Sequence, residues 1–399
     1  MPWKETCPMQ ERIKFISDYL EGELSMSALC REFGISRKTG YKLVRRFIEH
    51  QLDGLKDRSR APHKHPNAVS KSAEAAIVAA RRRHRTWGPK KLRVWLERTE
   101  PSVRWPAAST IGDILCRHGL SVPRRRSRKA VVYSEPFVGC DYPNAVWSGD
   151  FKGWFTTGDG VRCDPLTISD NYSRYLLRCQ ALVSPDYAHV QPVFEAAFRE
   201  YGLPVAIRTD NGAPFATTTV GGLSRLSIWW LKLGIVPERI IPGHPEQNGR
   251  HERMHRTLKK ETATPPKRSW RAQQRAFDRF CREYNQDRPH EAIAQSTPDR
   301  LYLRSAREYP LILPEMTYPD DMLVRSVKAQ GDISWKNHHI YLSETLAGEL
   351  IGLKPVTERF YDIYFGPVRL AQLDIHEKRL KHLPRIGRKN KGDIEKKNQ

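Results

Sequence analysis

The sequence predicts a multidomain chain: all-α helix-turn-helix modules come first, a central α/β domain with a mixed sheet follows, and a small β-barrel comes last. Three observations predict this order. The N-terminal part, up to residue 122, shows helical periodicity interrupted by glycine turns. Residues 135–305 mix strand-like and helical segments, which is typical of an α/β domain. Residues 320–376 hold short strand-like runs separated by Gly, Asn and Pro, as in small barrels.

The charge of the chain indicates a polyanionic partner. Its 399 residues include 68 Lys and Arg against 45 Asp and Glu, a net charge of +23. Such an excess is typical of nucleic-acid-binding proteins, although a ribosomal or merely soluble basic protein would show it too. The seven cysteines are dispersed without a CxxC pair, and no apolar signal core or membrane span is visible. We therefore expect reduced thiols, a cytoplasmic, nucleoid-associated protein and no membrane partner.

Residues 8–55 are predicted to form the first DNA-binding module. A helix over 10–22 is followed by a short helix, a turn at Gly34 and a basic helix that Ser36 caps. The apolar positions of that basic helix are Tyr41, Val44, Phe47 and Ile48. A helix fits the major groove and presents its first turns to the base edges. The side chains expected to contact DNA are Arg37, Lys38, Thr39, Lys42 and Arg45. An ordinary helical hairpin with a solvated charged face is the alternative.

Linkers and a second helical module are expected next. Residues 56–70 form a basic linker, and residues 71–122 form a second helix-turn-helix-like DNA-binding domain with Pro89 in the first turn of a helix. Residues 123–134 form a further basic linker, whose arginines can follow a phosphate backbone without reading sequence. These arginines are Arg124, Arg125 and Arg126. The tail, residues 385–399, is basic and poor in apolar residues, so we expect it to be disordered.

Two aspartates stand where strands are expected. Asp150 lies midway along "VWSGDFKGWF", and Asp210 follows the apolar run "LPVAI" in "RTDNG". A carboxylate in a strand costs desolvation unless a cation neutralises it, whereas Asp-Asn-Gly alone is also a good turn sequence. A third acid is available in "PGHPEQNGRHERMHRTLKKE". Three such carboxylates can hold two Mg²⁺ ions for phosphoryl transfer, and Mn²⁺ can substitute.

The segments "SGDF", "RTDNGAPF" and "PGHPEQNGRHERMHRTLKKE" resemble, in order, the catalytic core of retroviral-type integrases and bacterial insertion-sequence transposases of the DDE type. The resemblance implies an integrase core of RNase H-like fold over residues 135–305, with Asp150, Asp210 and Glu252 as catalytic metal ligands. Glu246 has the spacing from Asp210 that is common in the family. Glu252 is preferred because it follows the Pro-x-x-x-Gly-x-x segment and opens the helix. Extra residues around "TTTVGGLSRLSIWW" account for its longer separation.

Further side chains near Glu252 are assigned to DNA. Arg256 and Lys259 share a helix face with Glu252 and are expected to hold a DNA strand, although i,i+4 support of the helix is the alternative. Asn248 is expected to cap the helix and contact the substrate. The nearby histidines are interpreted as substrate-side or structural, since no matched second ligand set suggests zinc or manganese. These are His244, His251 and His255.

The resemblance implies a DNA transposase that binds the ends of its mobile element. It would cut a 3′ end with water and then join that end to target DNA. Its partners would be double-stranded DNA and further copies of the chain in a homo-oligomer. Two alternatives remain open from the sequence: a non-catalytic DNA-binding regulator, and an RNase H-like nuclease without strand transfer.

Overall fold

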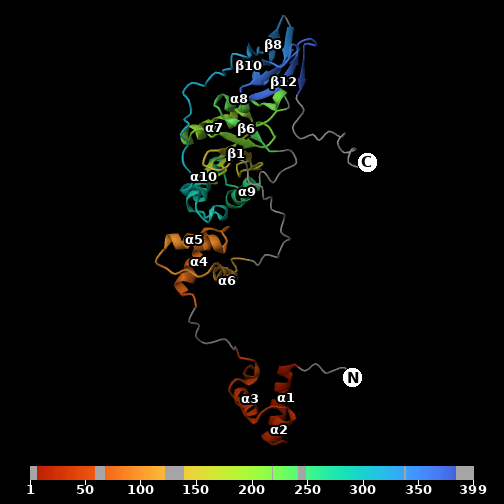
Figure 1. Cartoon of the computed structure of the whole chain (residues 1–399). Helices are drawn as coiled ribbons and strands as arrows, with labels where there is room; N and C mark the ends of the chain where they lie inside the picture. The colour runs from red at the N-terminus through yellow and green to blue at the C-terminus, as the bar shows by residue number, and fades with distance from the viewer. Residues whose placement is uncertain are drawn as a thin grey trace, which may run out of the picture. The chain divides into compact units, whose positions relative to one another are not determined.

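The computed structural model describes residues 7–58, 68–121, 139–217, 219–240, 249–336 and 338–382. The chain divides into two compact units, Met1–Ala68 and Val69–Gln399, which are described separately (Figure 1). None of the helices in these described ranges has the length and apolar character that a membrane span requires.

The first unit is a small three-helix domain. Its helices are α1 (Pro8–Glu21), α2 (Met26–Glu32) and α3 (Arg37–His50), followed by the short 3₁₀ helix η1 (Gln51–Leu55). The Ser36 hydroxyl accepts a hydrogen bond from the Thr39 amide and so caps α3. At Gly40, a Cβ would lie 2.5 Å from Sγ of Cys30, so the glycine lets α2 and α3 cross closely.

Two of the four apolar positions named for the basic helix lie on the exposed face of α3. Leu43 and Val44 are buried, but Tyr41 is 60% exposed and Ile48 is 69% exposed. Tyr41 and Ile48 are seven residues apart and therefore share one side of the helix. A domain of three short helices buries a narrow stripe of α3, so these two side chains remain on the solvent face.

The second unit begins with three helices, α4 (Lys71–Arg83), α5 (Pro89–Thr99) and α6 (Ala108–Arg117). Their shared core includes Ile77, Trp87, Leu92 and Ile111, all fully buried. Pro89 occupies the first turn of α5, where its missing N–H has no helical partner to lose.

A mixed sheet forms the centre of the second unit, as predicted. Its strands are β1 (Val146–Phe151), β2 (Phe155–Thr156), β3 (Arg162–Asp170), β4 (Leu176–Leu182), β5 (Ala206–Thr209) and β6 (Val236–Arg239). They lie in the order β2-β3-β1-β5-β6, and β4 pairs with β3. The pairs β1–β5 and β5–β6 are parallel, and the pairs that β3 makes are antiparallel.

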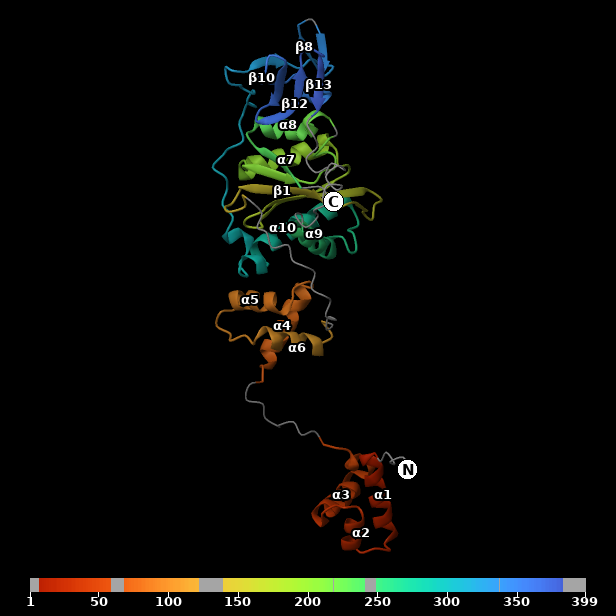
Figure 2. The same ribbon diagram turned by 45° about the vertical axis from the view of Figure 1, so that its right-hand side comes forward.

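Helices cover both faces of this sheet (Figures 1 and 2). One face carries α7 (Tyr187–Tyr201) and α8 (Arg225–Lys232), which pack with Trp147 and Ile168 in one apolar cluster. The other face carries α9 (Gly249–Thr262) and α10 (Trp270–Arg282), which pack with Cys163 and Cys179 in another. The break between α9 and α10 falls at the predicted "TPPK" segment.

The C-terminal part contains an open sheet and not the predicted barrel. Strands β7 (Leu323–Ser326), β10 (Leu350–Pro355), β11 (Phe360–Phe365), β12 (Val368–Asp374) and β13 (Arg379–His382) lie in the order β13-β12-β11-β10-β7. A separate hairpin joins β8 (Asp332–Trp335) to β9 (His338–Tyr341). Over the residues that the structure describes, β13 and β7 are the two edges, so the sheet does not close.

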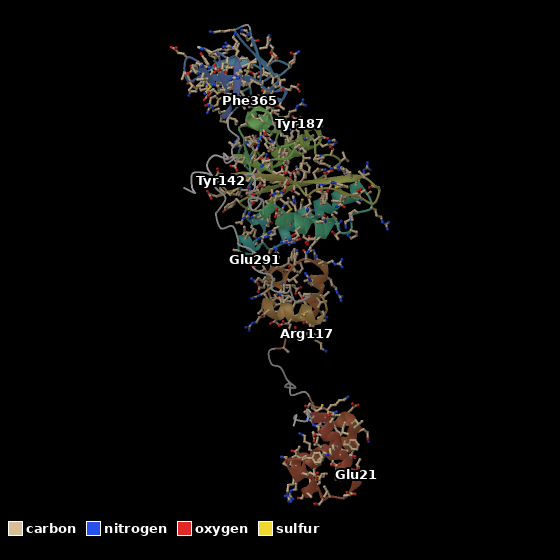
Figure 3. All side chains as sticks on the ribbon, turned by 90° about the vertical axis from the view of Figure 1, so that its right-hand side faces the viewer. Glu21, Arg117, Tyr142, Tyr187, Glu291 and Phe365 are labelled. Carbon is tan, nitrogen blue, oxygen red and sulfur yellow. The ribbon has the colours of Figure 1, made fainter. Side chains whose placement is uncertain are left out.

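The apolar side chains of this sheet are buried in one cluster with α8 and with the β8–β9 hairpin. Ile228 and Leu231 of α8 belong to one buried cluster with Leu353 and with Phe365, which Figure 3 labels. Leu223, from the extra residues before α8, belongs to the same cluster. The segment around Leu223, between Asp210 and Glu252, therefore packs against the C-terminal sheet.

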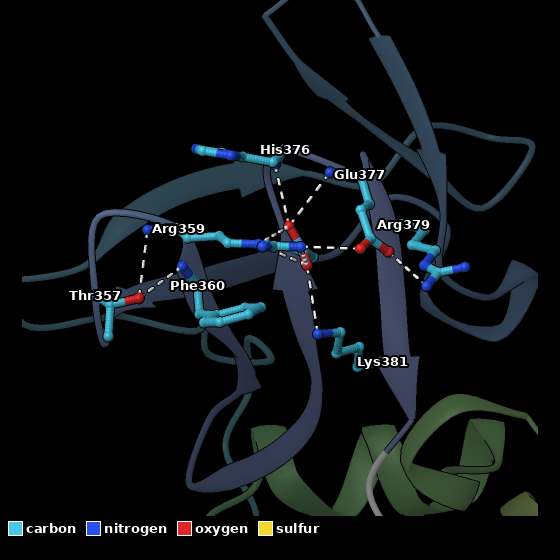
Figure 4. Close-up of polar contacts among 8 residues, drawn as sticks. Thr357, Arg359, Phe360, His376, Glu377, Arg379 and Lys381 are labelled. Carbon is cyan, nitrogen blue, oxygen red and sulfur yellow. Dashed lines mark hydrogen bonds and ion pairs between the residues drawn. The ribbon is translucent and has the colours of Figure 1, made fainter.

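A buried carboxylate organises the edge of the C-terminal sheet (Figure 4). The side chain of Asp374 is inaccessible to solvent. Its two oxygens accept hydrogen bonds from Nε of Arg359 at 2.9 and 3.0 Å, and Oδ2 accepts a third from Nη2 at 2.7 Å. The backbone amides of His376 and Glu377 donate to Oδ1. The Arg359 hydrogen bonds hold the pKa of Asp374 far below its usual range.

We predict that Asp374 makes the free energy of unfolding depend on pH in the acid range. The folded carboxylate resists protonation, so its stabilisation is complete above the unfolded pKa of about 3.9 and is lost as the pH falls below it. Urea denaturation of the full chain between pH 7 and pH 2 should show this loss in the wild type and less of it in Asp374→Asn. Asp321→Asn, at an exposed carboxylate beside Lys354, is the control. Parallel curves for Asp374→Asn and wild type would contradict the prediction.

Candidate active site

The two predicted aspartates stand at the same level of neighbouring parallel strands. β1 pairs with β5 in a register that aligns Trp147 with Ile207 and Ser148 with Arg208. Two residues further along, the same register brings Asp150 beside Asp210, which directly follows β5. Neighbouring strands are about 4.8 Å apart. Both carboxylates therefore stand at the carboxyl end of the parallel part of the sheet.

Asp210 both forms a turn and presents a carboxylate. Its Oδ1 accepts a hydrogen bond from the Gly212 amide at 3.1 Å, which is an Asx turn. The Asn211 side chain donates to the carbonyl oxygen of Ile240 at 2.9 Å and ties the turn to the end of β6. The two interpretations of "RTDNG" are therefore compatible: the turn holds the carboxylate in place.

Helix α9 presents one face to the sheet and the other to solvent. His251, Met254, His255 and Leu258 are buried at the helical spacing of i, i+3, i+4 and i+7. The exposed face carries Glu252, Arg256 and Lys259. Glu252 therefore lies on the exposed side of the first turn of α9, next to His251, which packs on the sheet.

The hydroxyl of Thr167 joins α9 to β1. Thr167 lies directly opposite Asp150 in the β1–β3 pair and is fully buried. Its Oγ1 lies 2.7 Å from Nε2 of His251, 2.7 Å from Nε2 of His255 and 3.1 Å from the carbonyl oxygen of Asp150. One hydroxyl thus links the strand that carries Asp150 to the helix that carries Glu252.

Burial keeps both histidines neutral. Desolvation lowers the pKa of His251 to about 4 and, with the neighbouring His251 and Lys152 charges, lowers that of His255 to about 2. Nδ1 of His255 lies 3.8 Å from Oδ2 of Asp150. A neutral imidazole at this distance is a polar neighbour of the carboxylate, or binds a metal ion together with it, and does not form a charged ion pair with it.

The side chains that come closest together are not the predicted three. Asp150, His251 and His255 each offer a potential ligand atom, and these atoms lie within 4.8 Å of one another. In the described part of the chain, neither Asp210 nor Glu252 belongs to that group. The β1–β5 register places Asp150 and Asp210 at the carboxyl ends of neighbouring strands, and Glu252 lies on the exposed face of α9.

Several predicted site residues lie outside the described residues. They are Arg124, Arg125, Arg126, His244, Glu246 and Asn248.

The predicted DNA-contacting side chains of α3 all lie on its exposed side. Arg37, Lys38 and Lys42 are exposed, and Arg45 donates to Glu49 at 2.9 Å on the helix surface. The Thr39 hydroxyl is 2.9 Å from the Ser36 hydroxyl, so it takes part in the cap that starts the helix.

No local pattern in the sequence indicates Thr167, the residue that links α9 to β1. A threonine in a strand is ordinary, and its partners lie 84 and 88 residues away. The two histidines could be seen, because a spacing of four residues places them on one helix face. Their common hydroxyl partner could be found only in three dimensions.

Protein-family models match most of this architecture. Two models described as integrase core domain match residues 141–245 and 233–298. A helix-turn-helix domain model matches residues 11–63, and a homeodomain-like domain model matches residues 39–115. The chain therefore carries an integrase core preceded by helix-turn-helix domains.

The relatives of the chain come from insertion elements. It is 27% identical over 270 residues to an uncharacterized 39.2 kDa protein of IS476 from Xanthomonas euvesicatoria, covering 64% of this chain and 74% of the relative. It is 27% identical over 281 residues to an uncharacterized 31.7 kDa protein of IS407 from Burkholderia multivorans, covering 69% of this chain and 94% of the relative. The resemblance to insertion-sequence transposases with an integrase-like core is confirmed.

Retroviral integrase structures are among the solved structures that match the chain. The catalytic core of HTLV-2 integrase in complex with magnesium is 16% identical and covers 41% of this chain and 98% of its own, with a TM-score of 0.32. A simian T-cell lymphotropic virus intasome is 16% identical and covers 74% of this chain and 97% of its own, with a TM-score of 0.34.

We predict that Thr167→Val lowers the free energy of unfolding by about 2 kcal/mol or more, because it leaves buried ring nitrogens without a partner. Thr167→Ser keeps the hydroxyl and loses one methyl group, so its cost should be about 1 kcal/mol. Chemical denaturation of the full chain measures both. A valine variant at least as stable as the serine variant would show that the hydroxyl does not hold α9 on the sheet.

Proposed function

We propose that this chain is a DNA transposase that cuts the ends of its mobile element and joins them to target DNA. The supporting observation is the β1–β5 register, which sets Asp150 beside Asp210 within an integrase core domain. An integrase core implies polynucleotidyl transfer, and helix-turn-helix domains imply DNA binding. DNA transposition is the activity that these two features and the insertion-element relatives support together.

The carboxylates at the carboxyl ends of β1 and β5 are suitable ligands for divalent cations. Asp150 and Asp210 offer hard oxygen ligands side by side, and Glu252 at the rim of α9 can turn toward them. Three carboxylates gathered at one point would repel one another unless cations lay between them. We assign Asp150, Asp210 and Glu252 as the ligands of two Mg²⁺ ions, which Mn²⁺ can replace. When bound, such a pair activates the attacking oxygen and stabilises the leaving oxygen.

The chain's own side chains bind and orient the DNA. Arg256 and Lys259 lie on the exposed face of α9 with Glu252, where their charges attract the phosphates on either side of the scissile bond. The exposed cations of α3 hold the element end. Water attacks first and frees a 3′ hydroxyl, and that hydroxyl then attacks target DNA in line. Neither displacement requires a nucleophilic side chain.

Two element ends must be cut and joined together, so we propose a homo-oligomer on DNA. The alternatives are a nuclease that cuts without joining and a regulator that only binds. Labelled duplexes that carry the DNA flanking the gene on either side, incubated with the full chain and Mg²⁺, separate them. Joined products support the proposal. Cut products alone indicate the nuclease, and unchanged bound DNA indicates the regulator.

We predict that Asp150→Asn, Asp210→Asn and Glu252→Gln each reduce strand transfer at least about 1000-fold while DNA binding persists, because each removes several kcal/mol of transition-state stabilisation. Glu246→Gln is the matched control and should remain active. Initial rates of joined product, with binding measured in EDTA, test this. An inactive Glu246→Gln variant beside an active Glu252→Gln variant would reassign the third ligand.

We predict that Lys42→Ala weakens DNA binding equally for all sequences. The slope of log K against log salt should fall by about one, since one phosphate contact is lost. Lys42→Arg keeps the charge and should keep the slope. Fluorescence anisotropy gives both slopes when it is measured between about 50 and 200 mM salt, where DNA affinity depends strongly on salt. An unchanged slope for Lys42→Ala would place Lys42 away from the DNA.

A further inference from the structure

The hydroxyl of Thr167 fixes where the histidine protons lie. Its three neighbours are a carbonyl oxygen, which can only accept, and two ring nitrogens. A hydroxyl has one proton, so all three contacts are hydrogen bonds in one arrangement only. Thr167 donates to the carbonyl oxygen of Asp150, and Nε2–H of His251 and of His255 both donate to Thr167. Nδ1 of each ring then points away from Thr167.

Nδ1 of His255 faces the carboxylate of Asp150. Nδ1 and Oδ2 are 3.8 Å apart, and the two side chains are only 6% and 15% exposed. A ring nitrogen and a carboxylate oxygen that are both nearly buried at this separation can share a cation or a proton. Nitrogen and oxygen ligands bonded at about 2.1 Å to one metal ion are at most about 4.2 Å apart, so the observed separation fits a shared ion.

The surroundings of His255 also match those of a ligand. A metal-binding histidine nearly always donates its second ring N–H to an oxygen atom, which fixes the tautomer and the ring orientation. Thr167 provides that oxygen for His255 at 2.7 Å. His251 shares the helix, the burial and the hydroxyl, and its ligand atom also lies within 4.8 Å of those of Asp150 and His255, but the 3.8 Å contact with Asp150 is made by His255. His251 is therefore the matched control.

We propose that His255 supplies a nitrogen ligand, through Nδ1, to the cation that Asp150 binds, with Thr167 as the partner that orients the ring. This inference rests on the proposed function for the assignment of Asp150 as a metal ligand. Imidazole suits Mn²⁺ and later transition metals better than Mg²⁺, which prefers oxygen. The site would therefore favour Mn²⁺ over Mg²⁺ more strongly than three carboxylates alone.

Pulsed electron paramagnetic resonance on Mn²⁺ tests the nitrogen ligand without any reaction. The full chain is prepared with ¹⁵N-labelled histidine and loaded with Mn²⁺ in the absence of DNA. We expect a directly coordinated ¹⁵N in the wild type, its loss in His255→Gln and in a second variant, His255→Asn, and its retention in His251→Gln. Thr167→Val should weaken Mn²⁺ binding by about 10- to 100-fold. Circular dichroism establishes that each variant is folded.

Two results would overturn the inference: Mn²⁺ bound with oxygen ligands alone, or a nitrogen signal that His251→Gln removes and both His255 variants keep. Absence of Mn²⁺ binding, or binding that Asp150→Asn leaves unchanged, would also overturn it. Failure of the proposed function is distinguishable. A chain that shows the His255 nitrogen but never joins DNA keeps this site and loses the transposase assignment. A chain that joins DNA but binds Mn²⁺ through oxygen ligands alone keeps the transposase assignment and loses the His255 ligand.

Discussion

The parallel pairing of β1 with β5 is the constraint on which the site depends. Through backbone register, it aligns the strand positions of Asp150 and Asp210, which are sixty residues apart in the chain. Because one strand shifted by a single residue would turn its side chains to the other face of the sheet, the buried residues on both faces also fix the position of the acids. Gly149 contributes to this, since a Cβ there would lie 2.9 Å from Cζ of Phe194 in α7.

The other half of the site is held by a different kind of interaction. Helix α9 packs through Met254 and Leu258 against the sheet, and this apolar contact alone would allow it to slide or rotate. The Thr167 hydroxyl and its two histidine partners give the helix one specific position. A buried polar network of this kind is stable only when each member has a partner, so it specifies a unique arrangement.

The sequence was sufficient for the parts of the fold that have local signals. The mixed sheet, the Asp150 strand and the break between α9 and α10 follow from periodicity and proline placement. The exposure of Tyr41 and Ile48 could not be predicted, because apolar type at helical spacing does not say how wide a stripe a small domain buries. The barrel was wrong because short strands look alike in open and closed sheets. The buried surface of this one is covered by α8, a helix about a hundred residues away in the chain. The Thr167 contacts are equally non-local.

We propose that Asp150 and Asp210 bind the same divalent cation. The most direct measurement is a crystal structure of the full chain soaked with Mn²⁺, with anomalous scattering recorded to locate the metal. The account predicts an anomalous peak within bonding distance of both carboxylates. A peak that contacts only one of them, or that lies elsewhere on the chain, would contradict it.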